Sequence, residues 1–284
     1  MFFRVSGWVI LLFWAASMTW LIRHDVWPAL TAGEPPQVAP NRAGISGIQV
    51  FQVGIFNEYD HRIGTAWTTY APPRLREDVL YLSGFLLPGP ILLEIDSTFT
   101  GSGELDEFKL TARGPGIPLP TDGIHPPIEV RGERFASVYG FTLVAGGLEE
   151  SFKISAAEAG LIGDVFRPFA SLPGLEVGQS WRMQVVNPVS VVTGVGRRFV
   201  PMLVRVTGRE TILTPGGEEL SCLVVEAPNV TAWVDDEGLV WVQRVRLPIG
   251  GELTVRNEPY DEKARRNAMA AFRPGGHGGR RSVQ

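Results

Sequence analysis

The sequence has little cysteine and no strong excess of charge of either sign. Its 284 residues include one cysteine, Cys222, which excludes an intramolecular disulfide framework and a cysteine-rich metal site. The formal net charge is only −4, which excludes nucleic acid as the expected partner. Hydrophobic residues make up 44% and charged residues 20%, so we expect a folded globular chain.

Common catalytic motifs are missing as well. The chain contains no Gly-rich phosphate loop, no nucleophile elbow and no dinucleotide fingerprint. The four histidines are scattered and therefore predict no zinc site. We predict that the protein is not an enzyme and that it has no catalytic residue, cofactor or metal site.

Three local features allow a chemical alternative. Asp60-His61-Arg62 places a histidine beside an acid and a cation, the basis for a hydrolase or metal enzyme centred on His61. Neighbours on a strand point to opposite faces, so a polar turn is the favoured interpretation. Asp235-Asp236-Glu237 lacks the spacing of a calcium loop and is also interpreted as a turn. Cys222 lies in a strand pattern, which is typical of a small buried hydrophobe.

The N-terminal segment has the pattern of a membrane span. The 18 residues from Val5 to Ile22 carry no charge and, as a helix, would reach roughly 27 Å. Trp20 and Trp27 lie where an interfacial aromatic belt is expected. Residues 1–24 are therefore predicted to be a signal anchor, with a cleaved signal peptide or a buried soluble helix as the alternatives. The short stub before the span favours a cytoplasmic N-terminus and an exported, periplasmic body attached to the inner membrane.

The rest of the chain changes composition twice. Residues 25–48 are rich in proline and predict an extended stalk, and residues 49–258 show the period of two that indicates strands. Residues 259–284 are basic, with a short helix expected over 261–272 followed by a flexible tail. Within the exported body, 156–166 is the best candidate for a helix.

Alternating residues and turn signals predict sequential hairpins. Residues 91–113 form the clearest pair, with further turns expected at 131–133, 146–147, 215–217 and 235–238. The predicted fold is mainly β: a curved antiparallel sheet or partly closed barrel of sequential hairpins, preceded by one transmembrane helix.

Three sequence stretches resemble a known family. They are Tyr59-Asp60-His61-Arg62-Ile63-Gly64 leading into Trp67, the segment from Leu172 to Trp181, and Ala232-Trp233-Val234-Asp235 with Gly238. Over residues 50–245 the chain resembles the uncharacterised exported bacterial β-sheet proteins that are grouped as a domain of unknown function. The resemblance implies a curved antiparallel sheet in the cell envelope and implies no catalytic residue.

Four tryptophans lie in the predicted strands. We interpret Trp67, Trp181, Trp233 and Trp241 mainly as core rings, and as an apolar binding face in the alternative interpretation. The predicted function is non-enzymatic: an anchored extracytoplasmic protein that binds another envelope protein or a lipid-like amphiphile. The alternative is an accessory subunit of a larger membrane complex.

Overall fold

The structure is a computed structural model that describes most of the predicted β region. The described residues are 13–14, 16–20, 33, 48–71, 75–84, 89–100, 105–115, 127–136, 138–155, 172–186, 199–246 and 251–272. The candidate helix 156–166, Trp27 and His125 lie outside them, as does the chain after 272.

The elements whose bounds the structure describes are fourteen strands and the C-terminal helix α5 (Glu262–Ala271). The strands are β1 (Gln49–Phe56), β2 (Arg62–Ala71), β3 (Leu75–Leu82), β4 (Ile91–Phe99), β5 (Leu105–Arg113), β6 (Ile128–Phe135), β7 (Val138–Ala145), β8 (Leu148–Ser155), β9 (Ser180–Val186), β10 (Phe199–Leu213), β11 (Glu219–Ala227), β12 (Val230–Val234), β13 (Val240–Arg246) and β14 (Glu252–Glu258).

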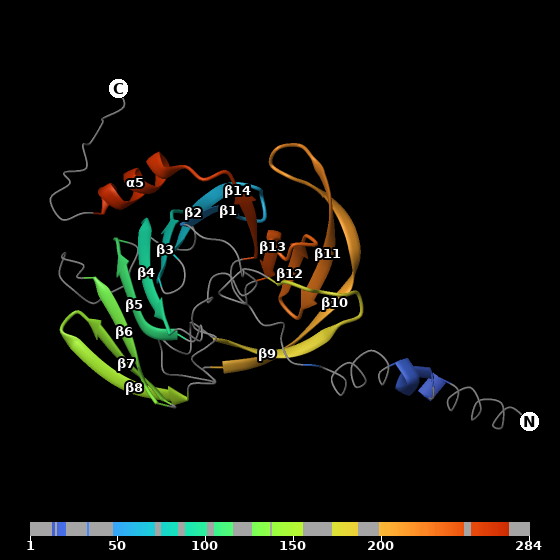
Figure 1. Cartoon of the computed structure of the whole chain (residues 1–284), viewed down its shortest axis with the longest axis horizontal. Coiled ribbons are helices and arrows are strands. Elements are labelled where there is room, and N and C mark those ends of the chain that lie inside the picture. The colour runs from blue at the N-terminus through green and yellow to red at the C-terminus, as the bar shows by residue number, and fades with distance from the viewer. Residues whose placement is uncertain are drawn as a thin grey trace, which may run out of the picture.

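All fourteen strands belong to one open antiparallel sheet. Their order is β8-β7-β6-β5-β4-β3-β2-β1-β14-β13-β12-β11-β10-β9, so each neighbouring pair follows in sequence except β1 and β14. Figure 1 shows the sheet strongly curved, with β8 and β9 as its two edges. The predicted mainly β fold of sequential antiparallel hairpins is confirmed, and the sheet does not close on itself.

Several hairpins in the described part of the chain turn at a glycine with a positive φ. The turn between β7 and β8 contains Gly146 and Gly147 with φ of 57° and 86°, and β4 pairs with β5 as the 91–113 pattern predicts. The expected turn at 131–133 is wrong, because β6 continues to Phe135 and the chain reverses near Ala136, whose φ is 56°. Gly132 instead lies in the strand under the Phe141 ring, where a Cβ atom would approach ring carbons within 2.7–3.3 Å.

The two faces of the sheet carry different clusters. The inner face, inside the curve, holds Ile55, Leu80 and Val255 near the centre, and a larger cluster around Trp181 and Val225 on β9–β12. The outer face holds Trp67, Val79 and Leu92 on β2–β4. Residues opposite each other on neighbouring strands lie on the same face of a sheet. Gly54 pairs with Arg256, Arg256 with Val242, and Val242 with Trp233, so the outer face continues across β14 and β13 onto β12. The outer face therefore runs without a break from β2 across β1, β14 and β13 to β12.

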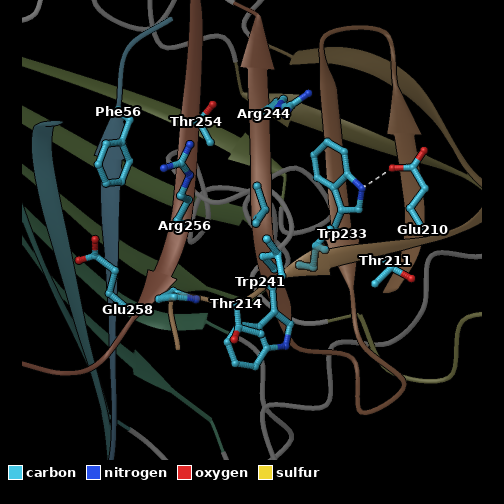
Figure 2. A pocket seen from close by; sticks show the side chains of 14 residues that line it. Phe56, Glu210, Thr211, Thr214, Trp233, Trp241, Arg244, Thr254, Arg256 and Glu258 are labelled. Carbon is cyan, nitrogen blue, oxygen red and sulfur yellow. Dashed lines mark hydrogen bonds between the residues drawn. The ribbon is translucent and has the colours of Figure 1, made fainter. Parts of the chain in front are cut away.

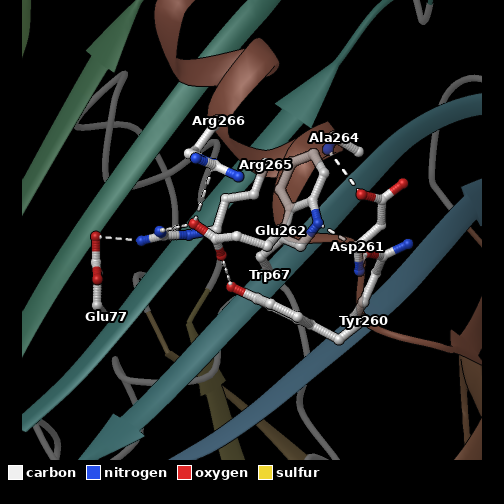
Figure 3. A network of polar contacts seen from close by, with 9 residues as sticks. Trp67, Glu77, Tyr260, Asp261, Glu262, Ala264, Arg265 and Arg266 are labelled. Carbon is white, nitrogen blue, oxygen red and sulfur yellow. Dashed lines mark hydrogen bonds and ion pairs between the residues drawn. The ribbon is translucent and has the colours of Figure 1, made fainter.

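Helix α5 covers the outer face of β2–β4, as Figure 1 shows. Asp261 caps its N-terminus by accepting a 3.0 Å hydrogen bond from the Ala264 backbone N–H. On the inward side Ala264, Ala268, Met269 and Phe272 pack over Trp67, Val79 and Leu92, which are at most 2% exposed. Arg265 pairs with Glu77 on β3 at 2.6 Å (Figure 3). The helix expected over 261–272 is therefore present and packs against the sheet.

Little of the N-terminal region belongs to the described residues. Residues 13–14 and 16–20 are helical, and Trp20 is 63% exposed. Among the described residues, no helix combines the length and the apolar character needed to cross a membrane. Farther along, the Gly33 backbone N–H donates a 2.9 Å hydrogen bond to the Ser180 carbonyl, which joins the predicted stalk to the β9 edge.

Candidate functional site

The outer face carries a groove of about 610 Å³ over β1, β14, β13 and β12. At fifteen residues β10 is three times as long as β12, and Figure 1 shows the end of the β10–β11 hairpin curving back toward β14. Residues 210–215 of this hairpin form one wall of the groove, and the sheet forms its floor. Figure 2 shows the lining side chains, which are Phe56, Glu210, Thr211, Ile212, Leu213, Thr214, Pro215, Trp233, Trp241, Val242, Arg244, Thr254, Arg256 and Glu258.

The strand register brings these side chains to one face. Phe56 pairs with Thr254, which pairs with Arg244, and these three lie across β1, β14 and β13. The next row on the same face contains Arg256, Val242 and Trp233. Residues distant in sequence therefore meet because β1 and β14 are neighbours in the sheet.

Arginine side chains stack on the aromatic rings of the groove. Phe56 lies between two guanidinium groups, with Arg62 at 5.5 Å and Arg256 at 4.7 Å from the ring centroid. Arg244 lies 5.0 Å from the centroid of Trp233. Such cation–π contacts orient a guanidinium while its N–H groups remain able to donate.

The ion pairs leave the arginines in different situations. Arg62 pairs with Glu258, and Arg256 Nη2 lies 2.6 Å from Asp60 Oδ1. Arg244 Nε is 3.9 Å from Glu252 Oε1, at the outer limit of an ion pair, and its side chain is 55% exposed. Arg244 is therefore the least neutralised of the three cations and the best placed to meet an anion from solvent.

Gly54 makes room for the Arg62–Glu258 pair. A Cβ atom at this position would lie 2.7 Å from Phe56 Cε2 and 2.8 Å from Arg62 Nη2, and would also collide with the Glu258 carboxylate. The side chains of three neighbouring positions thus lie over a residue that has none. A glycine in a strand interior often marks such a close approach.

The two tryptophans of the groove are held by carboxylates. Trp233 Nε1–H donates to Glu210 Oε2 at 2.8 Å, and Trp241 Nε1–H donates to Asp235 Oδ2 at 2.8 Å. Asp235 Oδ1 also accepts hydrogen bonds from the backbone N–H groups of Glu237 and Leu239, so Asp235 closes the β12–β13 turn. The acidic stretch 235–237 is a turn, and the described residues contain no group of three potential ligands that could hold a metal ion.

The structure separates the four tryptophans of the predicted binding face. Trp67 lies under α5 and Trp181 lies in the inner cluster, both nearly inaccessible to solvent. Of the four, Trp233 and Trp241 alone line the groove. Alternation along a strand indicates that a ring is buried, but it does not reveal which face of the sheet buries it.

The other candidates for chemistry are dispersed. His61 lies in the exposed β1–β2 turn, where its backbone N–H donates to Asn57 Oδ1 at 2.9 Å. Cys222 is fully buried, and desolvation, the largest cause, raises the pKa of its thiol to about 11. The thiol of Cys222 is therefore protonated at neutral pH, where it packs as a small buried group and is a poor nucleophile.

The arginines of the groove were not predicted from the sequence. Arg244 and Arg256 lie twelve positions apart, and Phe56 is far from both in the chain. The available signal was the alternation of each strand, which places Arg244 on the same face as Val242, but it does not reveal that β1 lies beside β14. Long-range pairing creates this site.

Comparison with known proteins does not extend these observations. No protein-family model matches the chain, and no curated protein sequence or solved structure is significantly similar to it. The resemblance to exported β-sheet proteins stays a prediction.

Proposed function

We propose that the protein is a non-enzymatic binding protein of the cell envelope. The segment Val5–Ile22 anchors it in the inner membrane, and the exported sheet binds an amphiphile that carries an anionic group. The hydropathy of the N-terminal segment supports the anchor. The observation that carries the binding role is the groove in which Arg244 and Arg256 lie beside aromatic rings.

The groove offers an anionic headgroup two guanidinium groups. Arg244 and Arg256 lie on neighbouring strands of one face, and both side chains are at least 40% exposed. A guanidinium binds carboxylate and phosphate oxygens through paired N–H groups, and such charge-assisted bonds are stronger than neutral ones. Their stacking on Trp233 and Phe56 limits the side-chain entropy that binding would otherwise remove.

The same groove offers an apolar surface for the rest of the ligand. Ile212, Leu213, Trp241 and Val242 lie on its wall and floor. Its volume falls within the range of about 300–1,000 Å³ that is typical of small-molecule sites. A ligand with a charged head and an apolar chain matches this division better than a fully polar ligand does.

Binding of octyl phosphate tests this proposal. The full-length protein in nanodiscs of zwitterionic lipid should bind octyl phosphate and should bind octyl trimethylammonium and inorganic phosphate much more weakly. Arg244→Gln should weaken octyl phosphate binding roughly tenfold or more, because a charged hydrogen bond contributes about 1.5–3 kcal/mol.

The control is Arg131→Gln, which removes an exposed guanidinium on β6, outside the groove. Equal losses in the two variants would indicate general charge attraction and would contradict a groove site. Absence of octyl phosphate binding would overturn the proposed ligand class. Equal affinity for inorganic phosphate would show that the apolar wall of the groove does not contribute to binding.

A further inference from the structure

Strand β8 (Leu148–Ser155) ends the sheet on one side. All eight of its residues pair with β7, from Val138↔Ser155 to Ala145↔Leu148. The described sheet has no strand on the other side of β8. One row of backbone N–H and C=O groups therefore faces outward along the full strand, and such an edge can pair with another strand.

The side chains of β8 alternate between the faces. Glu149, Ser151 and Lys153 share one face, while Leu148 and Glu150 lie on the other. All five residues are exposed, and Glu149 and Lys153 have no ion-pair partner within the described part of the chain. The two charges are four residues apart, about 13 Å along a strand, so they cannot pair with each other in the same chain.

We propose that two copies of the protein associate through antiparallel pairing of their β8 strands, with Ser151 on the two-fold axis. A two-fold axis perpendicular to the sheet reverses the strand direction and keeps each face on its own side. With Ser151 on this axis, Glu149 of one copy lies opposite Lys153 of the second copy, and Lys153 lies opposite Glu149. The edge is thus complementary to itself in both hydrogen bonding and charge.

This register is set by the charge pattern. Opposite residues must share a face, so the two strands can slide only in steps of two residues. If the two-fold axis moves from Ser151 to Glu150, Glu150 lies opposite Glu150 of the second copy. If it moves on to Glu149, Glu149 lies opposite Glu149 of the second copy. If the axis moves one residue toward the C-terminus, Glu149 lies opposite Ser155 and forms no ion pair. If it moves one residue farther, Lys153 lies opposite Lys153 of the second copy. Only the register centred on Ser151 forms both ion pairs.

Charged residues on an edge strand usually oppose pairing with other chains. The charges of β8 oppose pairing in other registers and pairing with strands that lack a matching charge pattern. A second β8 strand in the register centred on Ser151 gives both charges a partner of opposite sign. This favours a specific dimer over open-ended aggregation, because each copy uses its one β8 edge in a closed two-fold contact. The contact does not involve the groove and is independent of the proposed ligand.

Cross-linking of the full-length protein in a mild detergent tests the register. Residues opposite each other in an antiparallel pair have Cβ atoms about 4.5–5.5 Å apart, close enough for a disulfide after small adjustment. Ser151→Cys should therefore give a disulfide-linked dimer under mild oxidation. Glu218→Cys, in the exposed β10–β11 turn, is the control and should give little dimer. Cys222 is buried and should not contribute.

Charge reversal tests the complementarity. Lys153→Glu and Glu149→Lys each place like charges opposite one another twice, and each should raise the dimer dissociation constant roughly tenfold in sedimentation equilibrium. The double variant Glu149→Lys/Lys153→Glu restores opposite charges and should restore the dimer. A monomer at all concentrations would overturn the proposal. So would a dimer that is insensitive to both single reversals, or equal cross-linking through Ser151→Cys and Glu218→Cys.

Discussion

Gln52 connects the groove to helix α5 through its buried amide. Its Oε1 accepts 2.8 Å hydrogen bonds from Trp67 Nε1–H and from the Asp261 backbone N–H, and its Nε2 donates to Glu258 at 3.2 Å. Glu258 in turn pairs with Arg62 at the groove. The Gln52 side chain thus forms hydrogen bonds with a buried indole, with the residue that caps α5 and with a carboxylate that lines the groove.

We expect Gln52→Leu to destabilise the protein by about 2–4 kcal/mol. The substitution leaves the buried Trp67 indole N–H without its acceptor, which costs about 1–3 kcal/mol, and it also removes the acceptor of the partly buried Asp261 N–H. Urea unfolding measures this free energy. The surface variant Glu218→Gln should remain within about 0.5 kcal/mol of the unmodified protein. An unchanged urea midpoint for Gln52→Leu would contradict this role.

Cys222 provides a second prediction at the residue scale. Its pKa is raised from 9.0 to about 11, chiefly by desolvation, so at pH 8 the native thiol should be almost unreactive toward iodoacetamide. The folded state then binds the proton more tightly than the unfolded state. Stability linked to this thiol is complete below pH 9 and is lost as the pH rises toward 11. Rapid alkylation of the native protein at pH 8, measured by mass spectrometry, would contradict the burial.

At the scale of the elements, strand β6 depends on a glycine that does not form a turn. Gly132 lies beneath Phe141, which is 2% exposed in the cluster with Phe108 and Tyr139. The alternation of the flanking residues on β6 continues through Gly132 to Phe135. A small residue within a strand therefore has the same sequence signal as a turn, and the packing of an aromatic ring distinguishes the two.

We expect Gly132→Ala to destabilise the protein by about 1–3 kcal/mol. The added methyl group would overlap the Phe141 ring and force the ring or the strand to move. Gly208→Ala is the matched control, because a Cβ atom added at this strand glycine would meet no other atom within 4 Å and should be tolerated. Thermal unfolding compares the two variants, and equal melting temperatures would contradict overpacking at Gly132.

At the scale of the whole molecule, pairing of β1 with β14 joins the two halves of the sheet. Gln52 lies opposite Glu258, 206 positions later in the chain, so this ladder closes a very long loop. Ile55 packs with Leu80 from the first half and with Leu253 and Val255 from the second. The groove and the α5 contacts both depend on this junction.

We expect Ile55→Ala to weaken both halves of the sheet together. Truncation of a buried isoleucine costs about 2–5 kcal/mol, and here the lost contacts lie on both sides of the junction. Hydrogen exchange should show faster exchange in β4–β5 as well as in β11–β12. Ile212→Ala, on the wall of the groove, is the comparison and should leave the first half unchanged. Faster exchange confined to β1–β5 would indicate that the halves unfold independently.

The sequence by itself determined the local structure. Alternation predicted the 91–113 hairpin, and glycines at 146–147, 217 and 238 fall in turns that need a positive φ. Asp261 and the residues after it predicted the C-terminal helix, because an aspartate cap and helix-forming residues act within a few positions. These signals are short-range, so they can be read without knowledge of the partner strands.

Tertiary structure decided which segments meet. Alternation shows that each tryptophan has a preferred face, but it does not show what lies against that face. Helix α5 covers Trp67, the inner cluster surrounds Trp181, and Trp233 lines the groove. Likewise, neither Arg244 nor Phe56 has a local pattern that indicates a shared site. The physical reason is that the β1–β14 ladder, the bend of the β10–β11 hairpin and the position of α5 depend on contacts between residues far apart in the chain.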